Sequence, residues 1–375
     1  MRKWYSALVR LIFMALALCI CVHLSAQAKK RFNGPLKVAL AGISHDHVYL
    51  LMQHYKAGEV QIIGIAESDP DLIKKFKAQY HLADSLFFPD LPGLLKQKSE
   101  QIEVVMAFNA NAAHLGVVKD CAPFHVDVMV EKPLATTVKD AEEIVQLSDK
   151  YKIQVLTDYE TSWYASNQAL AVRVKSGEIG PIRKMVAHDG HQGPKEIGCS
   201  EAFLHWLTDP KANGAGALFD FGCYGANLMT WMMAGKAPIA VYATTKQIKP
   251  KIYPKVDDDA TIILDYPEAT GIIEASWNWP YSIKDFAVFG KTGYMKAADR
   301  NTLGVRGAEN ESLSQEKLPA PKAPYQDYIP YVTAVLRGAL QPGNDLSSLA
   351  NNLIVVKILS AARQSAKEGR KIYIR

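Results

Sequence analysis

Between residues 37 and 157 the chain alternates short apolar runs with longer amphipathic stretches. The apolar runs are Val38–Ala41, Ile62–Ala66, Val104–Phe108, Val126–Val130 and Ile153–Leu156. The helix-like stretches between them are Pro70–Tyr80, Ala112–Lys119 and Val138–Tyr151. Such alternation is typical of βαβ units, in which helices cover both faces of a parallel sheet. We therefore predict a doubly wound α/β domain over residues 36–157, with ligands bound beyond the carboxyl ends of its strands.

The pattern changes after residue 180, where strand-like runs are separated by turn residues. These runs are Ile182–Ala187, Ile239–Thr245, Ala260–Tyr266, Gly271–Trp277, Asp285–Phe289 and Gly293–Lys296. They predict an α+β domain over residues 158–345 with a large, mainly antiparallel open sheet. A helical stripe at 346–367 and a short strand at 371–374 follow, and we expect residues 346–375 to pack back on the body.

The first residues have the pattern of an export signal. Basic residues at positions 2, 3 and 10 accompany an apolar stretch at 11–24, and Ala26-Gln27-Ala28 supplies the small residues of a cleavage site. We expect a signal peptide over residues 1–28, cleaved after Ala28, and a periplasmic mature protein without membrane association. The alternative is an uncleaved anchor, for which the apolar stretch is short.

Charge and cysteine content narrow the classes of partner. Cleavage removes three basic residues and lowers the formal net charge from +5 to +2. A near-neutral chain gives no reason to expect nucleic acid as a partner. The remaining Cys121, Cys199 and Cys223 are too few for a disulfide framework and match no zinc spacing, so packing must hold the fold.

The first predicted strand leads into VALAGISHDHVYLL, residues 38–51, which is a candidate dinucleotide-binding turn. A G-x-G-x-x-G motif would place glycines at 42, 44 and 47, where this chain has Gly42, Ser44 and His47. Glu67 ends the second strand, where a carboxylate can accept the ribose hydroxyls of NAD and would repel the 2′-phosphate of NADP. Asp69 already supplies a cap for the next helix, which leaves Glu67 free for this role.

Two further segments contain candidate catalytic residues. Lys132 directly precedes a proline at the end of the fifth strand, where a partly desolvated ammonium can hold a hydroxyl or transfer a proton. Asp220 and Tyr224 are four residues apart near the start of a predicted buried helix, which would place them on one face. Each also has an ordinary interpretation: a solvated loop lysine, a helix N-cap and a core tyrosine.

In this order, the segments resemble the glucose–fructose oxidoreductase, inositol dehydrogenase and rhizopine-catabolism (Gfo/Idh/MocA) family. Its members have an N-terminal Rossmann domain, a Glu-Lys-Pro after its fifth strand, and a later Asp-x-x-x-His or Asp-x-x-x-Tyr. Residues 131–133 match the first motif, and Asp220 with Tyr224 matches the second. Asn111 and His114 resemble the family's N-x-x-H motif, and SAKEGRKIYI resembles its closing helix and strand.

The resemblance implies a site at the mouth of the Rossmann sheet. Lys132, Asp220 and Tyr224 would be catalytic, with Tyr224 or Lys132 moving the hydroxyl proton and Asp220 orienting the substrate and tuning Lys132. The cofactor would be NAD, which Glu67 favours over NADP. Its expected contacts are Gly42, Ser44, His45, Glu67, Asn109, Asn111, His114, Glu131 and Lys132. The open sheet of the second domain would support a homo-oligomer.

Aromatic and imidazole side chains near the predicted cleft suit a sugar, whose rings have apolar faces and hydroxyl edges. The candidates are Tyr159, Trp163, His188, His191 and His205. Core packing is the ordinary interpretation of each one. His188, Asp189 and His191 do not assure a complete ligand set, so we expect no metal.

We therefore expect an NAD-dependent oxidoreductase that transfers a hydride between nicotinamide and a sugar, sugar derivative or polyol. One alternative on the same fold is a glycosidase or lyase that oxidises a hydroxyl transiently, eliminates the aglycone and returns the hydride. Export favours this alternative, because free NAD is expected to be scarce outside the cytoplasm. A tightly held cofactor would also serve. A second alternative is a sugar-binding protein without chemistry, for which the missing glycines are the only support.

Overall fold

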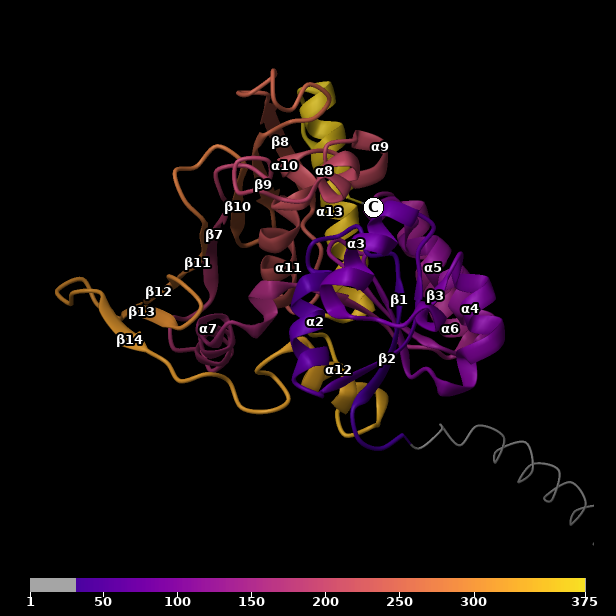
Figure 1. The fold of residues 1–375 in the computed structure, drawn as a ribbon. Helices are drawn as coiled ribbons and strands as arrows, with labels where there is room; N and C mark the ends of the chain where they lie inside the picture. Colours follow the sequence, from indigo (N-terminus) through magenta and orange to yellow (C-terminus); the bar gives the residue numbers. More distant parts are fainter. Residues whose placement is uncertain (1–31, 375) are drawn as a thin grey trace, which may run out of the picture. The chain divides into compact units, whose positions relative to one another are not determined.

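The N-terminal sheet has six parallel strands in the order β3-β2-β1-β4-β5-β6. Figure 1 shows this sheet and its helices in indigo to magenta. Its strands are β1 Leu36–Ala41, β2 Val60–Ala66, β3 Phe87–Phe88, β4 Val104–Ala107, β5 Asp127–Glu131 and β6 Val155–Asp158. The computed structural model describes residues 32–374, so the expected signal peptide lies outside the described residues. The strand order changes direction between β1 and β4, and this switch point is where doubly wound sheets bind ligands.

Helices cover both faces of this sheet, as the sequence predicts. They are α2 Val48–Lys56, α3 Pro70–Tyr80, α4 Leu91–Lys98, α5 His114–Cys121 and α6 Val138–Tyr151. Val38 and Leu40 of β1 lie in one core, whereas Ala39 and Ala41 lie in the other. This alternation follows from the two-residue period of a strand buried on both faces. The short β3 and the helix α4 were not predicted.

The second sheet has nine strands in the order β14-β13-β12-β11-β7-β10-β9-β8-β15. They are β7 Ile182–Gly190, β8 Ala240–Lys246, β9 Asp259–Asp265, β10 Thr270–Ser276, β11 Ile283–Gly290, β12 Tyr294–Ala297, β13 Thr302–Arg306, β14 Ser314–Lys317 and β15 Ile372–Tyr373. Its pairs are antiparallel apart from β7 with β10. The predicted fold class, a Rossmann domain with a mainly antiparallel second sheet, is confirmed.

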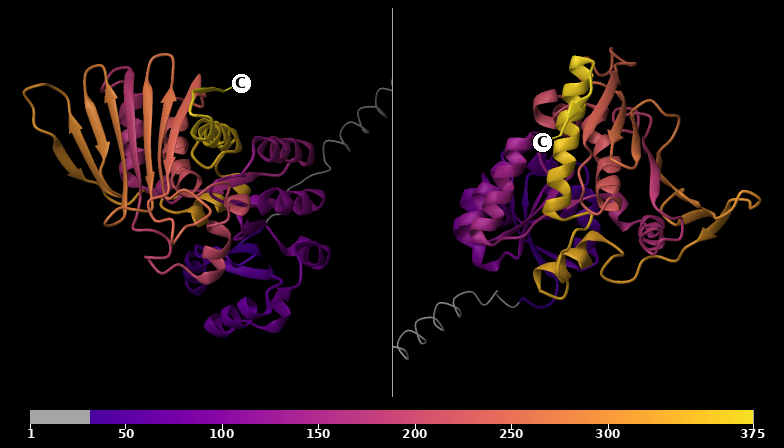
Figure 2. Two further views of the ribbon diagram at one scale, coloured as in Figure 1. Left: turned by 90° about the horizontal axis from the view of Figure 1, so that it is seen from above. Right: turned by 180° about the vertical axis from the view of Figure 1, so that it is seen from behind.

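Helices α7 Ala165–Lys175, α10 Ala217–Asp220 and α11 Gly222–Met232 lie against one face of the second sheet (Figure 2). The short helices α8 Glu201–Leu207 and α9 Pro210–Asn213 precede α10 and contact each other. Helix α11 packs closely on β7 and β10, because a Cβ added at Gly225 would lie 2.7 Å from Ile273 Cγ2. The alternating residues on the other face are partly exposed, as Tyr242, Ile263 and Phe289 show.

The last two helices, α12 Tyr328–Leu336 and α13 Leu349–Glu368, join the two sheets. Val355 of α13 lies in the core of the second sheet, and the adjacent Val356 lies in a core of the first. Helix α12 packs in the other core of the Rossmann sheet. The second domain was expected to extend over residues 158–345. This range is corrected at its end, because α12 lies within it and buries its apolar face against the first domain. No helix within residues 32–374 has the length and apolarity needed to span a membrane.

Candidate active site

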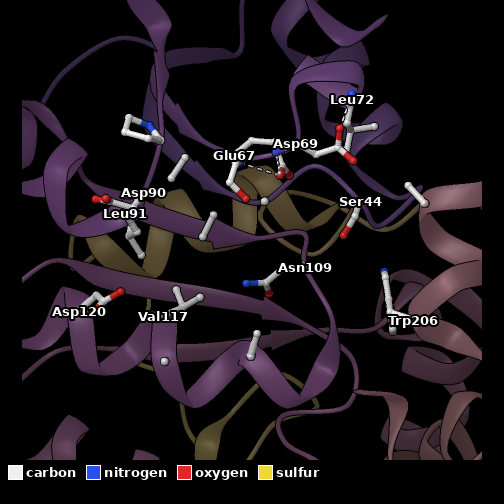
Figure 3. A pocket seen from close by; sticks show the side chains of 18 of the residues that line it. Ser44, Glu67, Asp69, Leu72, Asp90, Leu91, Asn109, Val117, Asp120 and Trp206 are labelled. Atoms are coloured by element: carbon white, nitrogen blue, oxygen red, sulfur yellow. Dashed lines mark hydrogen bonds between the residues drawn. The ribbon is translucent and has the colours of Figure 1, made fainter. Parts of the chain in front are cut away.

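The carboxyl edge of the Rossmann sheet opens into a cavity of about 560 Å³ (Figure 3). Gly42 and Ser44 line it from the turn after β1, and Glu67 and Asn109 line it from the ends of β2 and β4. Trp206 of α8 closes it from the second domain. The cavity therefore lies at the switch point, where the sequence predicts the dinucleotide.

The turn requires its first glycine and tolerates the loss of the other two. Gly42 has φ of +77°, and a Cβ there would lie 2.8 Å from Asn109 Cβ, so a side chain is excluded. The Ile43 N–H donates to Glu67 Oε2 over 3.1 Å, and the Ser68 N–H donates to Oε1 over 2.8 Å. These hydrogen bonds hold the Glu67 carboxylate at the cavity wall.

The cavity is acidic. Glu67, Asp69, Asp90 and Asp120 are among the described residues that line it, and those residues include no lysine or arginine. Burial and then the charge of Asp90 raise the pKa of Asp120. A 2′-phosphate would meet carboxylates here without a cation to pair with, so the wall favours NAD over NADP.

Asn109 provides an independent test of whether the cavity suits a polar ligand. Its Oδ1 is buried without a hydrogen-bond partner, and its side chain points into the hollow (Figure 3). Buried polar atoms are normally paired, so this oxygen offers an acceptor to a bound group. The residues present therefore fit a dinucleotide.

A second cluster lies where β5 meets the second domain. The Lys132 ammonium donates to the Asp220 carboxylate and, over 3.1 Å, to the Asp220 carbonyl oxygen. The Trp277 indole N–H donates to the other carboxylate oxygen over 2.9 Å. Burial lowers the pKa of Lys132, but the charge and hydrogen bond of Asp220, together with other nearby groups, raise that pKa overall. Burial raises the pKa of Asp220, but the charge and hydrogen bond of Lys132, together with His191 and Trp277, lower it overall. Both groups are therefore charged at neutral pH.

Tyr224 lies beside this ion pair. Lys132 Nζ is 5.3 Å from the centre of its ring, and Tyr159 packs edge-on against it at 5.6 Å. Burial raises the pKa of the Tyr224 phenol well above its usual value. Asp220 ends α10 and Tyr224 lies in the first turn of α11, so a break at Phe221 separates the residues that the sequence placed on one helix.

Sequence reasoning missed Lys284 and Glu160, which complete the cluster. Lys284 of β11 forms a salt bridge with Glu160, and its Nζ lies 4.7 Å from the centre of the Tyr224 ring. Burial raises the pKa of Glu160, but Lys284 outweighs it and lowers that pKa to about 2. Asp189 of β7 is paired in register with Lys284, and burial raises its pKa well above the usual value. The only sequence signal for Lys284 is a charge at an inward-facing strand position.

Asn111 and His114 do not line the cavity. The Asn111 amide donates to Asn213 Oδ1 over 2.8 Å and links the first domain to α9. His114 Nδ1 lies 3.1 Å from the Pro133 carbonyl oxygen, and burial lowers the pKa of its imidazole to about 4. These residues thus hold the Glu-Lys-Pro segment and the domain contact, which corrects their predicted contact with the cofactor.

The predicted sugar-binding residues are dispersed. His191 lies against Phe221 at 4.8 Å, beside Asp220, and Tyr159 backs Tyr224. His205 lines the cofactor cavity. Trp163 donates to Asp158 over 3.0 Å and packs in the Rossmann core, away from Lys132.

The structure corrects the predicted contact of His188 with the sugar. Its Nδ1 lies 2.7 Å from Asp285 Oδ1, and both residues occupy paired positions on the outer face of the second sheet. The inner face bears the neighbouring pair, Asp189 and Lys284. The two-residue period of β7 therefore points His188 away from the cleft.

Family comparison finds a match in each of the two domains. The oxidoreductase family with an NAD-binding Rossmann fold, GFO/IDH/MocA, matches residues 36–159, and the GFO/IDH/MocA C-terminal domain matches residues 167–296. The chain belongs to the GFO/IDH/MocA family. This GFO/IDH/MocA protein is accordingly an NAD-binding oxidoreductase, and the resemblance seen in its sequence is confirmed.

Individual relatives are distant. D-apiose dehydrogenase of Rhizobium rhizogenes is 24% identical over 70% of this chain and 76% of the relative. An inositol dehydrogenase homolog complexed with NAD⁺ from Azotobacter vinelandii has a TM-score of 0.78 at 19% identity, over 92% of this chain and 99% of that one. Aldose-aldose oxidoreductase from Caulobacter crescentus, complexed with glycerol, has a TM-score of 0.75 at 20% identity, over 90% and 99%. The structural likenesses establish the shared fold.

The cavity geometry predicts how Glu67 selects the cofactor. Glu67→Gln removes the charge that would accept the ribose hydroxyls, and a charge-assisted hydrogen bond of this kind is worth about 1.5–3 kcal/mol. We expect NAD to bind at least about tenfold more weakly, and the affinities for NAD and NADP to differ less. Calorimetric titration measures both affinities. Asp120→Asn, which removes a charge elsewhere in the cavity, should change the preference less. An unchanged preference in Glu67→Gln would remove Glu67 from the cofactor site.

Proposed function

We propose that this oxidoreductase oxidises a hydroxyl of a sugar, sugar derivative or polyol, with NAD as the cofactor. The observation that carries the proposal is the buried cluster of Lys132, Asp220, Tyr224 and Lys284, which joins the end of β5 to the second domain. Aromatic faces beside paired charges suit a polyhydroxylated ring. The named activities of D-apiose dehydrogenase and the inositol dehydrogenase homolog support this substrate class.

Lys132 is arranged to bind the oxygen of the reacting hydroxyl. An ammonium has three N–H donors, and Asp220 accepts two of them through its carboxylate and its carbonyl. The third donor remains for the substrate oxygen, where it would stabilise the negative charge that develops as the hydrogen leaves. NAD⁺, when bound, supplies the acceptor for the hydride from the carbinol carbon.

The catalytic cluster predicts a large loss of turnover in two variants. Lys132→Met and Tyr224→Phe each remove a donor that acts on the reacting oxygen, and such a loss costs about a hundredfold or more in rate. The measurement is single-turnover reduction of NAD at the NADH absorbance band, with a panel of sugars and polyols. Lys184→Met, on the outer face of the same sheet, is the control and should keep the wild-type rate.

The same assay separates the alternatives. An oxidoreductase reduces one NAD for each substrate oxidised. A redox-assisted glycosidase would release aglycone from an aryl glycoside without lasting NADH absorbance, and a sugar-binding protein would bind without either signal. Full activity in Lys132→Met, with the NAD-bound fraction intact, would contradict the catalytic role of Lys132.

We propose that the protein is exported. The support is the basic start, the apolar stretch at 11–24 and the Ala26-Gln27-Ala28 cleavage pattern. Amino-terminal sequencing of the periplasmic fraction should give Lys29 as the first residue. Recovery of Met1 from a cytosolic fraction would contradict export, and with it the need for a tightly held cofactor.

We propose that a second copy of the chain covers the outer face of the second sheet. Tyr242, Ile263 and Phe289 on that face are 37%, 36% and 40% exposed, so together they present apolar area to a partner. Light scattering should give at least a dimer for the wild type and a monomer for Ile263→Lys. Leu50→Lys, at an exposed position of α2, should leave the oligomer intact. A monomeric wild type would contradict this proposal.

A further inference from the structure

His47 occupies the third glycine position of the cofactor turn, and its imidazole contacts Glu131, the residue before Lys132 of the catalytic cluster. Its Nδ1 lies 3.0 Å from Glu131 Oε2, and Glu131 directly precedes Lys132. The Glu131 side chain is 4% exposed, whereas that of His47 is 34% exposed. The imidazole therefore connects the turn, the end of β5 and solvent.

Hydrogen bonds assign the protons of the neighbouring imidazoles. The His47 N–H donates to His45 Nδ1 over 3.1 Å, and the Gly193 N–H donates to His191 Nδ1 over 2.9 Å. In the neutral state His45 and His191 consequently carry their protons on Nε2 and can only donate from that atom. His47 is different, because its Nδ1 faces a carboxylate and carries the proton, which leaves the Nε2 lone pair free to accept.

The other groups at the reacting oxygen are poor proton acceptors. Lys132 is an ammonium paired with Asp220, and it keeps its proton at neutral pH. Tyr224 is a buried phenol whose pKa burial raises far above neutrality, so it is protonated as well. Asp189 is the remaining candidate, because burial raises the pKa of its carboxyl group. It is 1% exposed, so a proton that it accepts lacks the direct route to solvent that His47 has.

A metal ion is a second interpretation of this cluster. His45, His47 and Glu131 can bring three ligand atoms within 4.8 Å of one another. However, His45 Nδ1 already accepts a backbone N–H, so a metal on its Nε2 would require an imidazole with no proton on either nitrogen. The hydrogen bonds therefore favour a histidine–carboxylate pair over a metal site.

The charged and titratable groups around His47 come from several parts of the fold. They are Glu131 and Lys132 at the end of β5, Asp158 at the end of β6, Glu160 beyond it, Lys284 on β11, and His45 in the turn itself. Burial lowers the pKa of His47, the Glu131 carboxylate raises it more, and the two lysines lower it again. The result is a pKa raised above the ordinary 6.5.

We propose that His47 is the proton-transfer residue of this enzyme and that Glu131 holds its imidazole in the accepting tautomer. The inference rests on the proposed function. As the carbinol carbon loses its hydride to the cofactor, the hydroxyl O–H bond breaks and its proton passes to His47 Nε2. The substrate becomes a carbonyl compound. The negative charge of Glu131 balances the positive charge of the His47 imidazolium until His47 releases the proton to solvent.

The pH dependence of kcat tests this assignment. Oxidation needs neutral His47, so wild-type kcat should rise with pH through the raised His47 pKa. His47→Gln should lower kcat by about a hundredfold and remove that rise, with little change in the KM for NAD. The control is His54→Gln, which removes another carboxylate-bonded imidazole, on α2, and should leave both unchanged.

Two further variants distinguish other roles for the side chain. His47→Gly restores the third glycine, and wild-type turnover in it would overturn the proposal. A higher Kd for NAD with unchanged kcat in His47→Gln would make His47 a cofactor ligand instead, and would also overturn it. Loss of the pH-dependent rise in Asp189→Asn, with the rise retained in His47→Gln, would assign the proton to Asp189.

Nuclear magnetic resonance of the ligand-free protein, with labelled histidine, gives a readout independent of turnover. We expect a neutral His47 protonated on Nδ1, with a pKa above 6.5 that falls in Glu131→Gln because the stabilising charge is lost. The opposite tautomer, or no response to Glu131→Gln, would overturn the inference. A wild type without sugar-dependent NAD reduction would refute the proposed function itself, whereas active wild type with an unchanged profile in His47→Gln would refute only the role of His47.

Discussion

The buried ion pair between Lys132 and Asp220 is the interaction on which the site depends. Removing two charges from water is costly unless further hydrogen bonds satisfy them. Here the Asp220 carbonyl and the Trp277 indole supply those bonds, and all of the partners of Lys132 come from the second domain. The ammonium at the end of β5 therefore has its buried counter-charge only while the two domains are docked, which couples the catalytic geometry to the domain interface.

The same interface also closes the cofactor cavity. The Ser200 N–H at the start of α8 donates to Asp46 Oδ2 over 2.8 Å, so the cofactor turn is tied to the helix that carries Trp206. Asn111 and Asn213 form a second link, in the buried contact with α9. Helix α13 adds apolar contacts to cores of both domains through Val355 and Val356. These contacts position the cavity and the cluster relative to each other.

The departure from the glycine fingerprint is compensated within the turn. Gly42 is retained where the backbone needs a positive φ and a close approach to Asn109. Hydrogen bonds hold the residues next to the other two positions, since Glu67 accepts the Ile43 N–H and the Phe108 carbonyl accepts the His45 N–H. The loss of two glycines is therefore compatible with a turn held by its own hydrogen bonds. It gives little support to the alternative of a sugar-binding protein without catalytic activity.

The sequence by itself determined most of the Rossmann elements and the main motif residues. The apolar runs gave the Rossmann strands, because a strand buried on both faces reads as a continuous apolar segment. Lys132, Asp220 and Glu67 were recognisable from their positions at strand ends or in a motif. Only the tertiary structure decided which side chains meet: Lys284 and Glu160 joined the cluster, and His188 turned to the outer face. Alternation along a strand separates two faces but does not say which one is covered, and residues more than a hundred positions apart meet only through packing.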